Sequence, residues 1–335
     1  SLMFLDTSIN MAMQPFKMMV GDMVNEKQKG LAYSIQSFLC NAGSLVGFLF
    51  PFIFTWIGIS NIAPQGVVPD SVIYSFYIGA AILILCVIYT TVKVKEMPPA
   101  EYAEYHGITE EEKKEKINMV KLLVKAPKAF WTVGLVQFFC WFAFMFMWTY
   151  TNGSVAANVF DAPTVETVVN GASKIVLDTK SIQYQNAADW VGVLFAVQAI
   201  GSVLWAVCIP MFKNRKLIYS LSLVLGGIGF ISTYFVHNQY VLFISFLLIG
   251  CAWAAMLAMP FTILTNSISG KNMGAYLGLF NGTICIPQIV AAIIGGGLLH
   301  LVGGQQVNML VLAGVLLIIG AVCVHFITET FSTKS

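Results

Sequence analysis

The sequence has little charge. Asp, Glu, Lys and Arg make up 10% of its 335 residues, whereas 58% are hydrophobic. Soluble domains typically carry about 25% charged residues. This shortage excludes a soluble globular domain and indicates an integral membrane protein. The net charge is only +2, and we expect no nucleic acid partner.

The sequence also lacks the usual signatures of catalysis and metal binding. Its seven cysteines show no paired or metal-ligand spacing. It has no phosphate-binding loop, no zinc motif and no serine-elbow motif. We therefore expect no enzyme activity, no metal site and no bound cofactor, and we interpret the cysteines as small buried hydrophobic residues.

Long apolar segments are abundant instead. A bilayer core of about 30 Å requires about 20 apolar helical residues, and nine segments of this kind are present. They cover residues 1–21, 31–56, 71–93, 128–151, 188–211, 217–235, 240–265, 275–300 and 307–328. Their lengths fit helices rather than barrel strands of about 10 residues. The sequence therefore predicts an all-α, multi-pass membrane protein.

Basic residues gather in alternate loops. Of the 18 Lys and Arg residues, 15 follow spans one, three, five, seven or nine, and eight of these lie between residues 93 and 128. The opposite loops 57–70, 236–239 and 301–306 contain none. The positive-inside rule places the basic loops and the C-terminus in the cytoplasm.

The first span carries unusual charges. Asp6 and Lys17 interrupt an apolar stretch that ends near Asp22, and an ionisable residue inside a membrane is a functional-site hypothesis. On a helix, Asp6, Asn10 and Lys17 lie within about 40° of one another and Gln14 within about 80°. Asp6 and Lys17 are about 16 Å apart along the axis, too far to pair but far enough to bracket a disaccharide. Asp22 is interpreted as a membrane-edge charge.

The string LDTSINMAMQPFKMMVGD at 5–22 resembles the fourth-span signature of sucrose/maltose-type glycoside–proton symporters of the major facilitator superfamily, in its bacterial branch. That signature is an Asp, an Asn four residues on, a Pro, a basic residue and a second Asp. The family usually has Arg where this chain has Lys17. The resemblance continues through GLAYSIQSFLCNAGSLVGFLFP (30–51), VQFFCWFAFMFMWTYT (136–151), ADWVGVLFAVQ (188–198), GCAWAAMLAMPFTIL (250–264) and MGAYLGLFNGTICIPQIVAA (273–292).

The resemblance implies a domain plan. Nine of the family's twelve helices would be present, so we expect a fragment that lacks the first three spans. Residues 1–93 would form spans four to six of the N-terminal six-helix bundle, and 128–329 the whole C-terminal bundle. Residues 94–127 would be a cytoplasmic linker with a surface helix, because apolar residues and lysines alternate at helical spacing near its end. Residues 330–335 would be a cytoplasmic tail.

The resemblance also implies roles. Asp6 would be the proton-coupling carboxylate, with the proton as coupling ion, and Lys17 would bind substrate. Polar and aromatic residues near mid-membrane are further candidates for sugar binding. They are Asn10, Gln14, Gln36, Asn41, Gln137, Trp141, Trp148, Tyr150, Gln198, Asn281 and Gln288, with Ser37 and Trp253 beside them. The alternative for each Asn and Gln is an interhelical hydrogen bond, and for each Trp it is packing or a membrane-interface position.

The predicted function is proton-coupled symport of a disaccharide or short glucoside by alternating access, in the bacterial inner membrane. The expected partners are a small sugar and membrane lipid, and we expect a monomer. Sodium-coupled glycoside symport and a sugar sensor without transport remain the alternatives. A sensor would usually carry an enlarged cytoplasmic extension, and the linker and tail are short.

Overall fold

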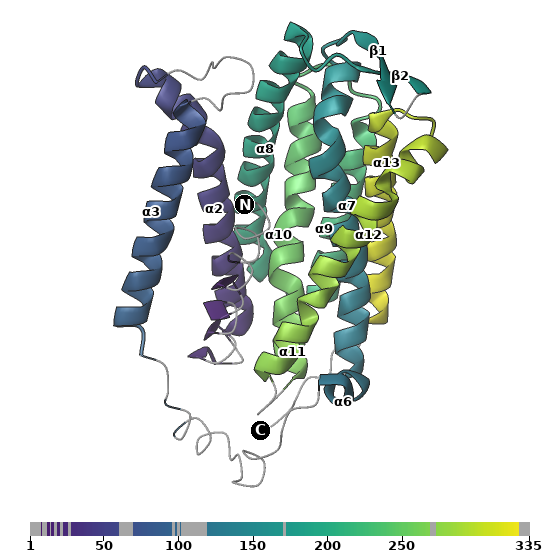
Figure 1. Cartoon of the computed structure of the whole chain (residues 1–335). Helices are drawn as coiled ribbons and strands as arrows, with labels where there is room; N and C mark the ends of the chain where they lie inside the picture. The colour runs from purple at the N-terminus through teal and green to yellow at the C-terminus, as the bar shows by residue number, and fades with distance from the viewer. Residues whose placement is uncertain are drawn as a thin grey trace.

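The computed structural model describes residues 28–59, 70–95, 119–169, 172–268 and 273–327, together with 98, 101 and scattered positions between 8 and 25. Within these ranges the chain is a helical bundle with one β-hairpin (Figure 1). The α-helices are α2 (Lys29–Trp56), α3 (Asp70–Lys93), α6 (Met119–Val124), α7 (Lys128–Asn158), α8 (Ile182–Cys208), α9 (Arg215–Ser232), α10 (Leu242–Ser267), α11 (Met273–Phe280), α12 (Gly282–Leu301) and α13 (Gln306–Cys323). Two 3-10 turns, η1 (Ile209–Met211) and η2 (Val324–Phe326), follow α8 and α13.

The expected all-α membrane bundle is confirmed. In the described part of the chain, seven helical stretches are long and apolar enough to cross a membrane. They correspond to the third through ninth expected spans. The second expected span is helical in α2, whose 28 residues exceed the length that a bilayer requires. Most of the first expected span lies outside the described residues. The chain is an integral, multi-pass membrane protein.

The two ends of the bundle differ. Helices α7 and α9 begin beside Lys128 and Arg215, and α10 ends and α11 begins at the same end. We call this the basic end, and its loops are the ones that the positive-inside rule predicts to be cytoplasmic. The hairpin lies at the opposite end, which we call the hairpin end (Figure 1).

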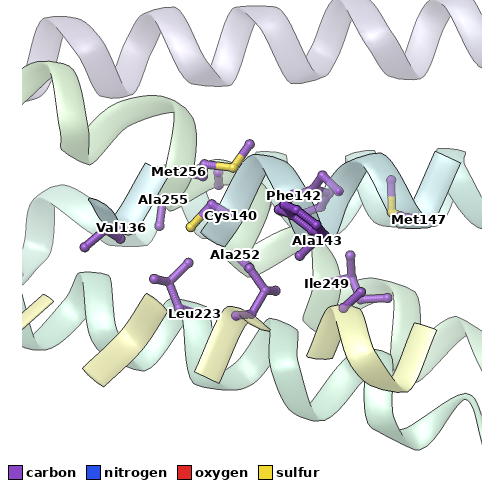
Figure 2. Packing of buried hydrophobic residues seen from close by; sticks show 14 of the residues in the cluster. Val136, Cys140, Phe142, Ala143, Met147, Leu223, Ile249, Ala252, Ala255 and Met256 are labelled. Atoms are coloured by element: carbon purple, nitrogen blue, oxygen red, sulfur yellow. The ribbon is translucent and has the colours of Figure 1, made fainter. Parts of the chain in front are cut away.

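The core lies in the second half of the chain. Helix α10 packs against α8 and α9, and α13 packs against α7 and α9. Figure 2 shows side chains of α7 and α10 gathered in one layer with Leu223 of α9; the layer includes Cys140 and Ala143 of α7 and Ala252 and Met256 of α10. These five residues are all almost fully buried. The C-terminal bundle therefore has a largely apolar interior, into which a few polar side chains are set.

Glycine allows the closest helix crossings. A Cβ at Gly201 of α8 would lie 2.6 Å from the Leu247 carbonyl oxygen of α10, and one at Gly250 would lie 2.3 Å from the Gln198 carbonyl oxygen. Because hydrocarbon gives no hydrophobic drive for helices to associate, close backbone approach at small residues supplies the van der Waals contact that holds them.

Helices α2 and α3 lie to one side. α2 packs along α8 and α10, whereas α3 packs against α2 and stands at the edge of the bundle (Figure 1). Most side chains of α3 are exposed among the described residues, including Phe76 and Tyr77. In a membrane protein such a face suits lipid or further helices.

A β-hairpin lies between the fourth and fifth expected spans. α7 continues to Asn158, and α8 begins at Ile182. Between them β1 (Thr164–Val169) pairs antiparallel with β2 (Ala172–Leu177) in the register Thr164↔Leu177. The sequence contained the signal, since Asn170-Gly171 between two β-branched runs is typical of a two-residue hairpin turn.

Two further boundaries differ from expectation. The fifth span was expected to start at 188, but α8 begins at Ile182, and its N-cap Ser181 accepts from the Tyr184 amide at 3.3 Å. The eighth span is interrupted at Asn281, which separates α11 from α12. Proline at 287 and glycine at 282 weaken regular helix near this point. Helix α6 lies within the stretch where we expected a surface helix.

Candidate functional site

The site begins with a proline in α10. Pro260 lies inside the helix and has no backbone N–H, so the carbonyl four residues earlier, that of Met256, loses its helical partner. Gln137 of α7 replaces that partner, because its Nε2 donates to the Met256 carbonyl at 3.1 Å. Gln137 is 1% exposed, and its Oε1 has no hydrogen-bond partner among the described residues. One half of a buried amide is therefore bonded and the other half is available.

Three indole rings gather beyond Gln137, two of them on α7 and the third, Trp253, on α10. The Trp141 and Trp253 ring centres are 5.8 Å apart, and Trp148 lies 5.7 Å from Trp253 and 6.4 Å from Trp141. Trp141 and Trp253 are half-buried, whereas Trp148 is 44% exposed. Trp141 Nε1 is buried, and none of the described residues accepts its hydrogen. We call Trp141, Trp148 and Trp253 the indole cluster.

Helix α2 brings polar side chains to the same part of α10. Ser37 Oγ donates to the carbonyl of Ala254, the residue after Trp253, at 3.3 Å. Asn41 Nδ2 donates to the Ser37 carbonyl at 2.7 Å, while Asn41 Oδ1 is buried and unpaired within the described residues. Gln36 Nε2 is likewise buried without a partner there. These residues connect the first half of the chain to the indole-bearing helix.

Asn281 lies at the break between α11 and α12. Its Nδ2 makes one long contact of 3.8 Å to Cys285 Sγ, and its Oδ1 is buried without a partner in the described ranges. Nearby, a Cβ at Gly134 of α7 would lie 3.0 Å from Thr283 Cγ2 of α12. The break therefore borders α7 about one turn from Gln137.

The structure does not bring every predicted residue to this place. Tyr150 packs at the α7–α12 crossing, where a Cβ at Gly295 would lie 2.8 Å from its Oη. Gln198 lies at the α8–α10 crossing. Gln288 is half-buried on α12. A helix-packing role fits Tyr150, and the predicted sugar-binding roles of Gln198 and Gln288 stay predictions.

Four predicted residues cannot be placed. Asp6, Asn10, Gln14 and Lys17 lie outside the described residues, so their predicted roles stay predictions. The residue that the prediction underweighted is Trp253. Its sequence signal was an aromatic residue in mid-span, which packing explains equally well, and only its contact with Trp141 and Trp148 distinguishes it.

The assembled groups suit one kind of chemistry. Gln137, Trp141 and Asn41 provide buried neutral donors and acceptors, and the indole cluster provides flat apolar faces. Such a site can hydrogen-bond an uncharged polyhydroxyl molecule and stack on its apolar face. Among the described residues, no three His, Cys, Asp or Glu side chains gather in a way that could hold a metal ion.

The fold, with buried polar groups between apolar helices, defines a polytopic helical membrane protein. The sequence pattern of the Major Facilitator Superfamily matches residues 8–177 and, in a second match, residues 155–334. The chain belongs to this superfamily, which indicates a transporter rather than an enzyme.

One solved structure illustrates the fold. A crystal structure of the E. coli fucose:proton symporter superposes with a TM-score of 0.61 at 13% sequence identity, covering 93% of this chain and 72% of that chain. At this identity the likeness shows the shared fold. No curated protein matches the sequence.

Proposed function

We propose that the protein is a proton-coupled symporter for a disaccharide or short glucoside, as the resemblance to sucrose/maltose-type symporters implies. The observation that carries the proposal is the buried, half-bonded amide of Gln137 beside the indole cluster. A sugar offers hydroxyl groups to the unpaired Gln137 Oε1 and Trp141 Nε1, and its ring carbons offer an apolar face to the indoles. The similar fold of a fucose:proton symporter supports a sugar as substrate.

The coupling group in this proposal is Asp6, with Lys17 in the substrate path. A carboxyl in an apolar environment is more easily protonated than in water, because the charged form loses solvation. One proton moving through 100 mV supplies about 2.3 kcal/mol. Substrate and proton together would favour the conformational exchange that moves both across the membrane.

Uptake of radiolabelled maltose and sucrose by cells expressing the complete coding sequence tests this proposal. Uptake should be abolished by a protonophore and by Asp6→Asn, and it should persist when sodium is replaced by potassium. Uptake that requires sodium and is unaffected by the protonophore would show that the coupling ion is sodium rather than the proton. Binding of maltose without any uptake would favour a sensor.

A further inference from the structure

The hydrogen bond from Gln137 to Met256 lies at the point where α10 can bend. It bonds the carbonyl that Pro260 leaves free, so it braces α10 at the point where that helix lacks one of its own hydrogen bonds. Helices bend most readily at such points. The part of α10 beyond Pro260, Phe261–Ser267, continues as helix, and Gln137 of α7 supplies a partner for the carbonyl that the proline leaves unbonded at its start.

Aromatic contacts close the basic end directly beyond the proline. Phe261 stacks on Tyr33 of α2, with ring centres 6.0 Å apart and planes 29° apart. Phe261 also meets Phe280 of α11 edge-on at 5.8 Å, and Phe280 meets Phe130 of α7 at 5.7 Å. All four rings are at most 3% exposed. Phe261 therefore closes the gap between α2 and the C-terminal bundle at this end.

A second contact brings the same segments together. A Cβ at Gly30, near the start of α2, would lie 3.5 Å from Thr262 Cγ2. The residue after Phe261 thus also borders α2. Any movement of α10 beyond Pro260 separates both pairs of contacts at once, because Phe261 and Thr262 are adjacent in the chain.

We propose that Gln137 is a positioning residue through which bound sugar controls closure of the basic end: its amide holds the Met256 carbonyl in the empty site, and a sugar competes for that amide. Two neighbouring hydroxyl groups of a sugar can donate to Oε1 and accept the Nε2 hydrogen that now bonds the Met256 carbonyl, which turns the amide away from α10. The Met256 carbonyl then loses its partner, α10 relaxes at Pro260, and Phe261 leaves Tyr33. The inference rests on the proposed sugar site.

Two substitutions should have opposite effects on whether the basic end is open or closed. Gln137→Met keeps the length of the side chain but cannot donate, so the basic end should open without sugar. Pro260→Ala restores an N–H for the Met256 carbonyl, so the basic end should stay closed with sugar bound, and transport should be lost while binding remains. Pro287→Ala on α12 is the matched control, since no hydrogen bond from another helix to the Thr283 carbonyl is found in the described part of the chain.

The measurement is electron–electron spin distance in purified full-length protein whose seven native cysteines are replaced by alanine. Spin labels at Leu31→Cys on α2 and Ser267→Cys on α10 report the basic end. Labels at Lys128→Cys and Leu217→Cys, on α7 and α9, report the rest of the C-terminal bundle. The ligand is maltose at saturating concentration, and its binding is followed separately by indole fluorescence.

In the unsubstituted background, maltose should add a longer Leu31–Ser267 distance and leave the Lys128–Leu217 distance unchanged. Gln137→Met should show the longer distance without maltose, Pro260→Ala the shorter one with maltose, and Pro287→Ala should behave like the background. Identical distances in the Gln137→Met, Pro260→Ala and background proteins would overturn the proposal. If maltose does not bind but Gln137→Met still shows the longer distance, the sugar assignment fails and the role of Gln137 in closure stands.

Discussion

Asn41, Gln137 and Asn281 each bury an amide oxygen that accepts no hydrogen bond from any described residue. A buried polar atom left unpaired costs about 1–3 kcal/mol, so these residues are poor choices for stability alone. A ligand or water that donates to them recovers this cost. At the scale of single residues, these unpaired oxygens lower the free energy of unfolding at the place where we propose that sugar binds.

The indole cluster leads to a prediction about affinity. Trp253→Ala should raise the KM for maltose uptake about tenfold, because losing a stacking face of about 1.4 kcal/mol changes affinity by that factor. Trp253→Phe should retain most of the affinity, since a smaller ring remains. Both are checked by initial rates of uptake at varied maltose concentration.

Trp190→Phe is the matched control. Trp190 stacks on Phe243 at 5.4 Å and donates to the Gln239 carbonyl at 3.2 Å, away from the indole cluster. Its substitution should leave the KM unchanged. An unchanged KM in Trp253→Ala would remove Trp253 from the substrate site.

Whole helices are positioned by small residues as much as by apolar ones. The α8–α10 crossing depends on Gly201 and Gly250, where backbone atoms of the partner helix occupy the space that a Cβ would need. Because α10 carries Trp253, Met256 and Pro260, this crossing also fixes the height and rotation of the candidate site. A substitution that moves the two helices apart at this crossing should therefore affect both stability and transport.

Gly201→Ala tests this dependence. Its Cβ would lie 2.6 Å from the Leu247 carbonyl oxygen, and overpacking of this kind typically costs about 1–3 kcal/mol. The substituted protein should unfold at a lower temperature in detergent, as measured by intrinsic fluorescence. Gly192→Ala is a control on the same helix, because no atom lies within 4 Å of its Cβ position, and helix propensity favours Ala over Gly. Equal unfolding temperatures for the two variants would contradict this account of the crossing.

At the scale of the whole molecule, the bundle has two chemically distinct ends. Lys213, Arg215 and Lys216 lie between η1 and the first turn of α9 at one end, and the β1–β2 hairpin lies at the other (Figure 1). The positive-inside rule predicts that the first is cytoplasmic. The closure at Phe261 would then face the cytoplasm, and the hairpin would face outward.

Cysteine labelling checks this orientation. In the cysteine-free background, Lys180→Cys beside the hairpin should react with a membrane-impermeant maleimide in intact spheroplasts. Lys213→Cys should react only after permeabilisation. Both side chains are exposed, so access to the reagent depends on the side of the membrane rather than on burial. The reverse pattern would invert the predicted topology.

Much of this architecture followed from composition and spacing. Seven of the nine expected spans are confirmed as membrane-length helices, and an eighth is helical in α2, because a run of about 20 apolar residues has no other stable state in hydrocarbon. The hairpin was not predicted even though Asn170-Gly171 indicated it, because its six-residue strands are far shorter than a membrane span. The expected absence of the first three spans stays a prediction.

The sequence by itself determined the membrane environment, the helical class, the approximate spans and the predicted orientation, because these depend on local hydropathy and on charge near each helix. Only the tertiary structure decided which polar residues share a site. Gln137 and Tyr150 were both predicted as sugar-binding residues, yet one bonds the Met256 carbonyl and the other packs against Gly295. The rotation of each helix, set by glycine crossings and by the proline in α10, makes that difference, and no single-helix pattern contains it.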